Sequence, residues 1–206
     1  MRLFRFVVTL FLIPVNIILT AGFILNFTRF TKIGPSEVVF AAGFISYLLL
    51  HFILYRPVFM HVMAHELTHA IWATLFGGKV KALNVSREGG SVIMEKSNFL
   101  VVLAPYFFPF YTAITLLVYV ITDVKYRDFI VFLTGLTFSF HIALTLYSLK
   151  QKQSDLKEAG VVFSLMFIYL ANLLVFAGIL AVVSEQFNIL NFFIGSYRFA
   201  EGFFVK

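Results

Sequence analysis

Cysteine is absent from all 206 positions of the sequence. Disulfide bonds and cysteine-based metal sites are therefore excluded, so any metal ion must be held by histidine and carboxylate side chains. Charge is also scarce, because Asp, Glu, Lys and Arg make up only 13% of the chain while hydrophobic residues make up 61%. A soluble domain usually has about 25% charged residues. This shortage of polar side chains excludes an ordinary soluble globular fold.

Long apolar runs take the place of the missing polar residues, and they predict an all-α polytopic membrane protein. The first run follows a basic residue, as in a signal peptide, but it is too long for one and lacks a convincing cleavage site. We therefore interpret it as a retained span. About six transmembrane helices are predicted, at Leu3–Leu25, Glu37–Tyr55, Val58–Phe76, Asn98–Thr122, Phe129–Leu149 and Gly160–Val183.

The net charge of +6 comes from basic residues scattered through short segments beside the apolar runs. Such residues anchor helix ends and orient membrane proteins, so no nucleic-acid partner is predicted. Six spans place both termini on one side, with segments 79–96 and 151–160 on the opposite side. A slight excess of basic residues on that opposite side favours the cytoplasm for it, in a multi-pass protein of the cell membrane. The sequence does not indicate an oligomeric state.

A polar motif interrupts the third apolar run, where His65 and His69 enclose Glu66 in the order His-Glu-x-x-His. Residues four apart project from one helix face, so the two imidazoles can bind one zinc ion. Zinc lowers the pKa of a bound water to about 7, and Glu66 can take the proton as general base. Ionisable residues in a membrane span are costly unless paired or hydrated, which favours a functional site over a chance motif.

Catalytic zinc usually has three protein ligands, and the residues leave two candidates open for the third. Asp155 lies in a polar segment on the same side of the membrane as the end of the third span, and it can reach inward if Ser154 begins a helix. His141 lies in the fifth span at a similar depth. His61, one turn before His65, is either a polar lining group or a hydrogen-bonded packing residue.

The residue composition changes after Gly77-Gly78. A glycine pair at this position is typical of a helix end. Mixed polar and β-branched residues predict a β-hairpin over 79–96, with strands at Lys79–Val85 and Ser91–Lys96. An edge strand beside the zinc could bind an extended substrate by β-augmentation, whereas a plain connecting hairpin is the alternative. Pro105 and Pro109 predict a kink in the fourth span.

Over about Val58–Leu174 the chain resembles the site-2 protease family of intramembrane zinc metalloproteases, with the best match in "HELTHA" and "LFGGKVKALNV". The resemblance implies that a distant aspartate completes the zinc site, which places Asp155 ahead of His141. The family's usual Asn-Pro-x-x-x-x-Asp-Gly context is missing, but "SLKQKQSDLKEAG" resembles the corresponding segment of more compact, divergent members. His141 would then contact a substrate carbonyl or the transition-state oxyanion.

The sequence thus predicts a zinc-dependent intramembrane metalloendopeptidase that cleaves a membrane-anchored protein or peptide within the lipid bilayer. Its metal ligands are predicted to be His65, His69 and Asp155, and its catalytic residues Glu66 and His141. The whole chain, 1–206, would form one transmembrane domain, with two helices in 1–57, the metalloprotease core in 58–183 and a membrane-surface tail in 184–206. The alternatives are a membrane metal-binding or transport protein and a scaffold without proteolytic activity.

Overall fold

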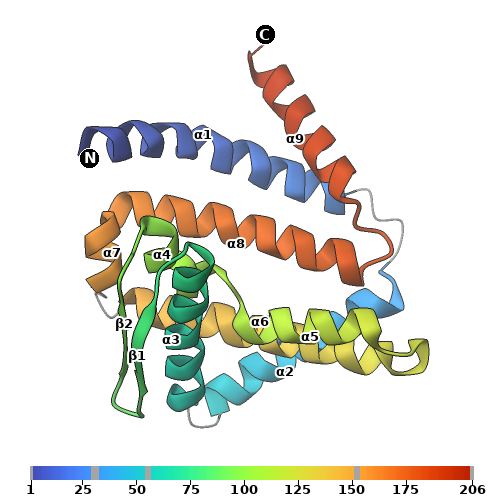
Figure 1. The fold of residues 1–206 in the computed structure, drawn as a ribbon. Helices are drawn as coiled ribbons and strands as arrows, with labels where there is room; N and C mark the ends of the chain where they lie inside the picture. The colour runs from blue at the N-terminus through green and yellow to red at the C-terminus, as the bar shows by residue number, and fades with distance from the viewer. Residues whose placement is uncertain (1, 29–32, 54–56, 151–153, 205–206) are drawn as a thin grey trace. The chain divides into compact units, whose positions relative to one another are not determined.

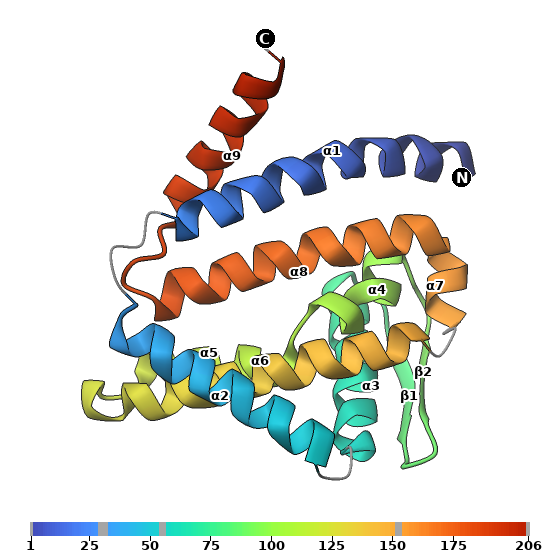
Figure 2. The same ribbon diagram turned by 180° about the vertical axis from the view of Figure 1, so that it is seen from behind.

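The computed structural model describes residues 2–28, 33–53, 57–150 and 154–204. Within these ranges the chain is mainly α-helical, with one two-stranded antiparallel sheet (Figures 1 and 2). The chain divides into two compact units: unit 1 contains Met1–Val38 and Gly160–Lys206, and unit 2 contains Val39–Ala159. Residues 54–56, at the junction of the second and third predicted spans, and residues 151–153 of the predicted 151–160 segment lie outside the described residues.

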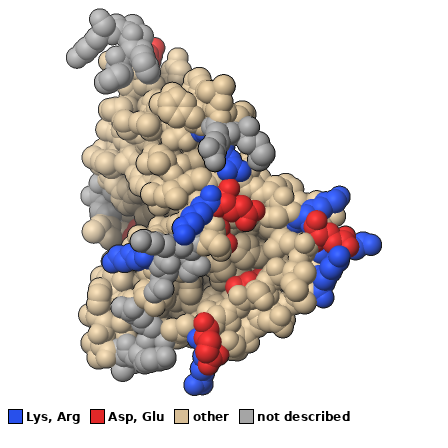
Figure 3. All heavy atoms as spheres, turned by 90° about the vertical axis from the view of Figure 1, so that its left-hand side faces the viewer, with Lys and Arg blue, Asp and Glu red and all other residues tan. Residues whose placement is uncertain are grey.

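Four helices in the described ranges are long and apolar enough to cross a membrane. They are α1 (Arg2–Phe27), α2 (Pro35–Ile53), α6 (Arg127–Lys150) and α8 (Val161–Val183). The face drawn in Figure 3 agrees with this composition, since charged residues form small groups on a surface made mostly of other residue types. These features fit a multi-pass membrane protein.

A fifth span is formed if α4 (Phe99–Phe107) and α5 (Phe110–Ile121) are counted together, although the two helices meet at a bend of 70°. Pro109 stands at this bend, as predicted, because proline cannot donate the backbone hydrogen bond that would continue α4. The predicted count of six spans is not confirmed. Helix α3 (Val58–Leu75), which carries the His-Glu-x-x-His motif, is not among the membrane-length apolar helices, because its histidines and Glu66 lower its mean hydropathy.

Unit 1 is built around α1, which packs against α8 and α9 (Ile189–Phe204). The side-chain amide of Asn16 on α1 donates a 3.1 Å hydrogen bond to the Met166 carbonyl on α8. Closer to the C-terminal end of α1, Phe23 packs against the rings of Phe176, Phe187 and Phe192. The segment after Ser184 therefore forms a helix that packs on α1, and its location at the membrane surface stays a prediction.

Helices α2 and α6 of unit 2 approach each other closely. A Cβ added to Gly43 would lie 2.0 Å from the Phe132 carbonyl oxygen, and one added to Gly135 would lie 2.1 Å from the Phe40 carbonyl oxygen. The two glycines therefore let the helix backbones touch, as small residues do where helices pack in membranes. A short 3-10 turn, η1 (Val124–Tyr126), connects α5 to α6.

Helix α3 ends at the predicted glycine pair. Gly77 has a φ of +72°, in the left-handed region that favours glycine. Its N–H donates to Thr74 O over 2.9 Å, and the Gly78 N–H donates to Ala73 O over 2.8 Å, so two carbonyls at the helix end are satisfied.

The predicted β-hairpin is confirmed directly after this helix end. Strand β1 (Val80–Val85) pairs antiparallel with β2 (Gly90–Met94), and Leu83 lies opposite Val92. The strand ends differ from the predicted ones by no more than two residues, which is the usual uncertainty of such boundaries. Both strands pack against α3 (Figure 1).

Candidate metal centre

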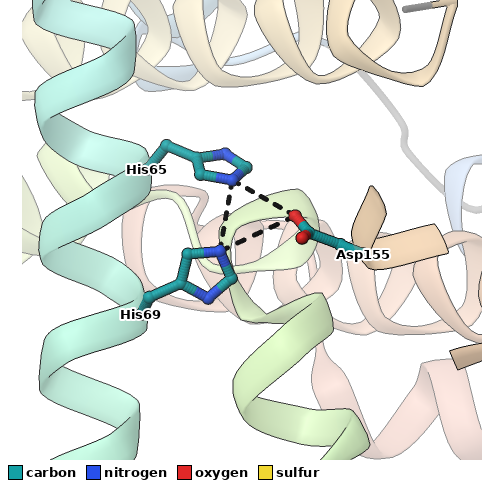
Figure 4. Close-up of side chains that lie close together, drawn as sticks. All are labelled: His65, His69 and Asp155. Atoms are coloured by element: carbon teal, nitrogen blue, oxygen red, sulfur yellow. Dashed lines mark hydrogen bonds and ion pairs between the residues drawn. The ribbon is translucent and has the colours of Figure 1, made fainter. Parts of the chain in front are cut away.

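Two histidines and an aspartate from different elements of unit 2 meet in the structure. The imidazoles of His65 and His69 project from α3 toward Asp155, in the first turn of α7 (Ser154–Ala159) (Figure 4). The two histidine Nε2 atoms are 3.2 Å apart. Asp155 Oδ2 lies 3.4 Å from Nε2 of His65 and 3.7 Å from Nε2 of His69. These three residues form a group that could hold a metal ion, hereafter the metal triangle.

The size of this triangle can be compared with the geometry of zinc. In a tetrahedral site with Zn–N and Zn–O bonds of about 2.0–2.2 Å, neighbouring ligand atoms are roughly 3.3–3.6 Å apart. The observed separations of 3.2, 3.4 and 3.7 Å lie close to this range. Two neutral imidazoles and a carboxylate are also ligand types that zinc prefers. The spacing and the chemistry of these three groups therefore fit a tetrahedral zinc ion.

A backbone carbonyl of α4 orients the ring of His69. Nδ1 of His69 lies 2.9 Å from the carbonyl oxygen of Val101, so the ring donates its Nδ1–H to that oxygen. With Nδ1–H committed to this carbonyl, Nε2 is the ring nitrogen of His69 that faces His65 and Asp155. A hydrogen bond from the second ring nitrogen to a carbonyl is common for metal-binding histidines.

Asp155 is held in its charged form. Burial of the side chain disfavours the carboxylate, but hydrogen bonds and attraction from His65 and His69 outweigh that effect and hold the pKa of Asp155 well below its usual range. The group is therefore a carboxylate at neutral pH, the protonation state that a metal ligand needs. Tyr106 on α4 adds a 2.9 Å hydrogen bond from its hydroxyl to Asp155 Oδ2.

Glu66 is 8% exposed, and the hairpin packs directly against it. A Cβ added to Gly90 of β2 would lie 2.4 Å from Glu66 Cγ and 2.8 Å from Val62 Cγ1. Strand β2 can therefore lie this close to α3 because position 90 has no side chain. The contact places the start of β2 beside the side chain of Glu66, the candidate general base.

Two clefts meet at His65, Glu66 and Gly90. The first, of about 390 Å³, contains the metal triangle and is lined along one side by β2. Its β2 residues are Gly90, Ser91, Val92 and Met94. The second, of about 320 Å³, extends toward α6 and the hairpin turn, where Ser148 and Glu88 line it. An extended chain that passes from one cleft to the other would run past Glu66 and the metal triangle.

His141 is not a member of the group formed by His65, His69 and Asp155. It lines a small cavity of about 20 Å³ together with His61 and His65, a space large enough for one water molecule. Neither of the two larger clefts has His141 among its described lining residues. His61 donates to or accepts from Ser148 Oγ over 2.8 Å, so it is hydrogen-bonded and also lines the small cavity. The structure therefore brings Asp155, rather than His141, to the two histidines of the motif.

Sequence reasoning did not single out Tyr106, Gly90 or the Val101 carbonyl. Tyr106 and Val101 lie in an apolar run in which each residue is typical of a buried core, and Gly90 lies between the two predicted strands. No spacing rule links any of them to a motif on α3. A weak signal was available for Tyr106, because a hydroxyl within an apolar segment needs a hydrogen-bond partner.

No protein-family model, curated protein or solved structure matches the chain. The chemistry that the residues allow is nevertheless specific. Two imidazoles and a carboxylate converge on one point, and a further carboxylate, that of Glu66, lines the same cleft. This set of groups can hold a metal ion and accept a proton beside it.

Proposed function

We propose that the protein is a zinc-dependent metalloendopeptidase that cleaves a membrane-anchored protein or peptide. The observation that carries the proposal is the triangle of His65, His69 and Asp155, with sides of 3.2–3.7 Å, in a cleft that also contains Glu66. The resemblance of the α3 motif and of the segment that follows it to the site-2 protease family supports the same reaction.

The roles of the residues follow from their positions. A zinc ion held by His65, His69 and Asp155 would supply Lewis acidity to a water molecule and to the scissile carbonyl. The Glu66 carboxylate takes a proton from the attacking water as its oxygen bonds to the carbonyl carbon. Glu66 then delivers that proton to the amine nitrogen as the C–N bond breaks. One water is consumed, and the products are a carboxylic acid and an amine.

The hairpin is proposed to present the substrate. A peptide that is helical in lipid has its amides bonded internally, so the scissile segment must be extended before cleavage. Strand β2 lines the metal cleft and, among the described residues, is paired with β1 alone. Its other edge can pair with an extended substrate segment, which places that segment against Gly90 and Glu66.

The apolar helices of the chain support the proposed substrate class. Four or five apolar helices would keep the enzyme in a bilayer, where a substrate anchored in the same bilayer reaches the cleft by lateral diffusion. We place the protein in the cell membrane, with the cleft open to the cytoplasmic side. The basic residues near the hairpin and the α6–α7 connection support this orientation.

The test combines metal analysis with one conservative substitution. Detergent-purified protein is expected to contain one zinc per chain, both in the wild type and in Glu66→Gln. Hydrolysis of a fluorophore-labelled casein is expected to fall about 10²- to 10⁴-fold in Glu66→Gln, the usual contribution of a general base. Glu95→Gln is the matched control, because Glu95 is exposed and paired with Lys81 on β1.

The alternative functions give different results. A metal transporter would show zinc flux in proteoliposomes that Glu66→Gln leaves unchanged, and no hydrolysis by the wild type. A scaffold would contain no stoichiometric zinc. Either result would refute the proposed function.

A further inference from the structure

We propose that Tyr106 is a positioning residue of the metal centre, whose hydroxyl holds the Asp155 carboxylate in the place where it binds the metal. This inference rests on the proposed zinc site, but the contact itself does not require the metal. The Tyr106 hydroxyl donates to Asp155 Oδ2 over 2.9 Å, and this is the oxygen that faces both histidines.

Asp155 needs an external constraint more than the two histidines do. His65 and His69 lie one turn apart on α3, an 18-residue helix whose own geometry aligns them. Asp155 instead lies on α7, which has six residues. A helix this short has little stability of its own, so its position depends on tertiary contacts. The inward side of α7 is buried through Leu156 and Ala159, and α7 packs against α4.

Tyr106 is built into the most buried part of α4. Its side chain is 1% exposed, and Leu103 and Ala104 beside it are completely buried. The tyrosine ring also meets the His65 ring edge-on, with centroids 5.4 Å apart and planes at 87°. A side chain packed this tightly has few alternative rotamers, so the position of its hydroxyl in the site is well defined.

Helix α4 thus touches each member of the triangle. The Val101 carbonyl accepts from His69, the Tyr106 ring packs on His65, and the Tyr106 hydroxyl donates to Asp155. Residues 101 and 106 are a little more than one turn apart, so one short helix can supply all three contacts. The bend at Pro109 lets α4 lie against α3 at this level while α5 continues in another direction.

The hydrogen bond is compatible with metal binding at the same oxygen. A carboxylate oxygen has two lone pairs, so Oδ2 can accept from Tyr106 with one and face the metal with the other. The bond is charge-assisted and buried, which makes it stronger than an exposed neutral one. Without the hydroxyl, Asp155 keeps its contacts with the two histidines and with Ser154 Oγ, 3.4 Å from Oδ1, but its carboxylate is oriented less tightly, and zinc must order it further on binding.

The experiment measures zinc affinity by competition with a chromophoric chelator. Tyr106→Phe keeps the ring and removes the hydroxyl, and it is expected to weaken zinc binding about 10- to 100-fold, as loss of such supporting hydrogen bonds commonly does. Tyr111→Phe is the matched control, because the Tyr111 hydroxyl donates over 2.9 Å to the Met60 carbonyl and not to a ligand. In an Asp155→Ala background, Tyr106→Phe is expected to cause no further loss, because its partner is gone.

A second readout does not involve zinc. In the metal-free protein, hydrogen exchange of backbone amides in 154–159 is expected to be faster in Tyr106→Phe than in wild type, with exchange in α3 and α8 unchanged. Unchanged exchange in those helices also shows that the variant is folded. Zinc affinity equal to that of Tyr111→Phe, together with wild-type exchange in α7, would overturn the proposal. Faster exchange in α7 in a protein that binds no zinc would refute the proposed function and leave the positioning of Asp155 supported.

Discussion

At the residue scale, the structure distinguishes between the two open predictions for a third metal ligand. Asp155 Oδ2 lies within 3.7 Å of both histidine Nε2 atoms, whereas His141 lines a different cavity. Asp155→Ala is therefore expected to weaken zinc binding by more than about 100-fold, beyond the loss usual for a supporting residue. His141→Ala is expected to bind zinc with close to wild-type affinity. Chelator competition on both variants measures this, and loss of zinc from His141→Ala alone would reverse the assignment.

The same residues show what the sequence could and could not predict about the site. The spacing of His65 and His69 determines that they share a helix face, so their convergence follows from local geometry. The approach of Asp155 depends on how α7 packs against α4, and no local rule contains that information. The resemblance to a known family selected Asp155, and the structure shows the juxtaposition that this selection requires. Tyr106 has no motif partner in sequence and emerges from the packing alone.

At the element scale, the first residue of β2 in the hairpin, Gly90, lies against Glu66. Gly90→Ala would place a methyl group 2.4 Å from Glu66 Cγ, so either the hairpin or the Glu66 side chain must move. Displacing a catalytic group by about 1 Å can cost up to roughly 10²-fold in rate. We expect casein hydrolysis to fall about 10- to 100-fold while zinc content stays at the wild-type level.

The control for Gly90→Ala is Gly178→Ala on α8, where an added Cβ meets nothing within 4 Å. It is expected to retain full hydrolysis. If Gly90→Ala also retained it, the hairpin would not be in contact with the working position of Glu66, and the alternative of a plain connecting hairpin would stand.

The end of α3 is a second element-scale feature with a measurable effect. Gly77 has a φ of +72° and open space around it, so Gly77→Ala causes no clash and only backbone strain. A residue with a side chain in this conformation costs about 1–2 kcal/mol. We expect the free energy of unfolding to fall by about 1 kcal/mol, measured by reversible denaturation in mixed micelles. Gly202→Ala on α9, which also has open space and no positive φ, is expected not to lower it, because alanine favours a helix more than glycine does.

The sequence predicts an element well when neighbouring residues determine it. It predicts an element poorly when packing against distant parts of the chain determines it. The glycine pair ended α3 and the β-branched residues formed the hairpin as expected, because both signals act through neighbouring residues. The bend between α4 and α5 was indicated by Pro109, but its angle of 70° was not. The length of an apolar run alone cannot distinguish a straight span from a bent pair, and this is one reason why the count of six spans is not confirmed.

At the scale of the whole molecule, the metal triangle and both clefts belong to unit 2, residues 39–159. Helix α8, which the sequence grouped with the metalloprotease core of 58–183, belongs to unit 1. Each residue proposed to hold the metal or move a proton thus comes from a continuous stretch of chain between α2 and α7. The apolar helices of unit 1 contribute two of the four membrane-length helices, so its proposed contribution is membrane anchoring.

The absence of cysteine makes the orientation of the whole molecule directly measurable, since every introduced cysteine is a unique label site. Arg87 is at the exposed hairpin turn, Lys157 is exposed on α7, and Lys125 is exposed before α6. Helix α6 is long and apolar enough to cross the bilayer, so the segments at its two ends should lie on opposite sides. The hairpin and α7 both line the metal cleft, which places them on the same side.

Single Arg87→Cys, Lys157→Cys and Lys125→Cys variants can be treated with a membrane-impermeant maleimide in right-side-out and inverted vesicles. Arg87→Cys and Lys157→Cys are expected to react in inverted vesicles, which expose the cytoplasmic face, and Lys125→Cys in right-side-out vesicles. Labelling of the first two in right-side-out vesicles instead would reverse the orientation and leave the site intact. Labelling of Arg87→Cys and Lys125→Cys from the same side would contradict the arrangement itself. In that case, α6 would not cross the membrane between the α5–α6 connection and the metal cleft.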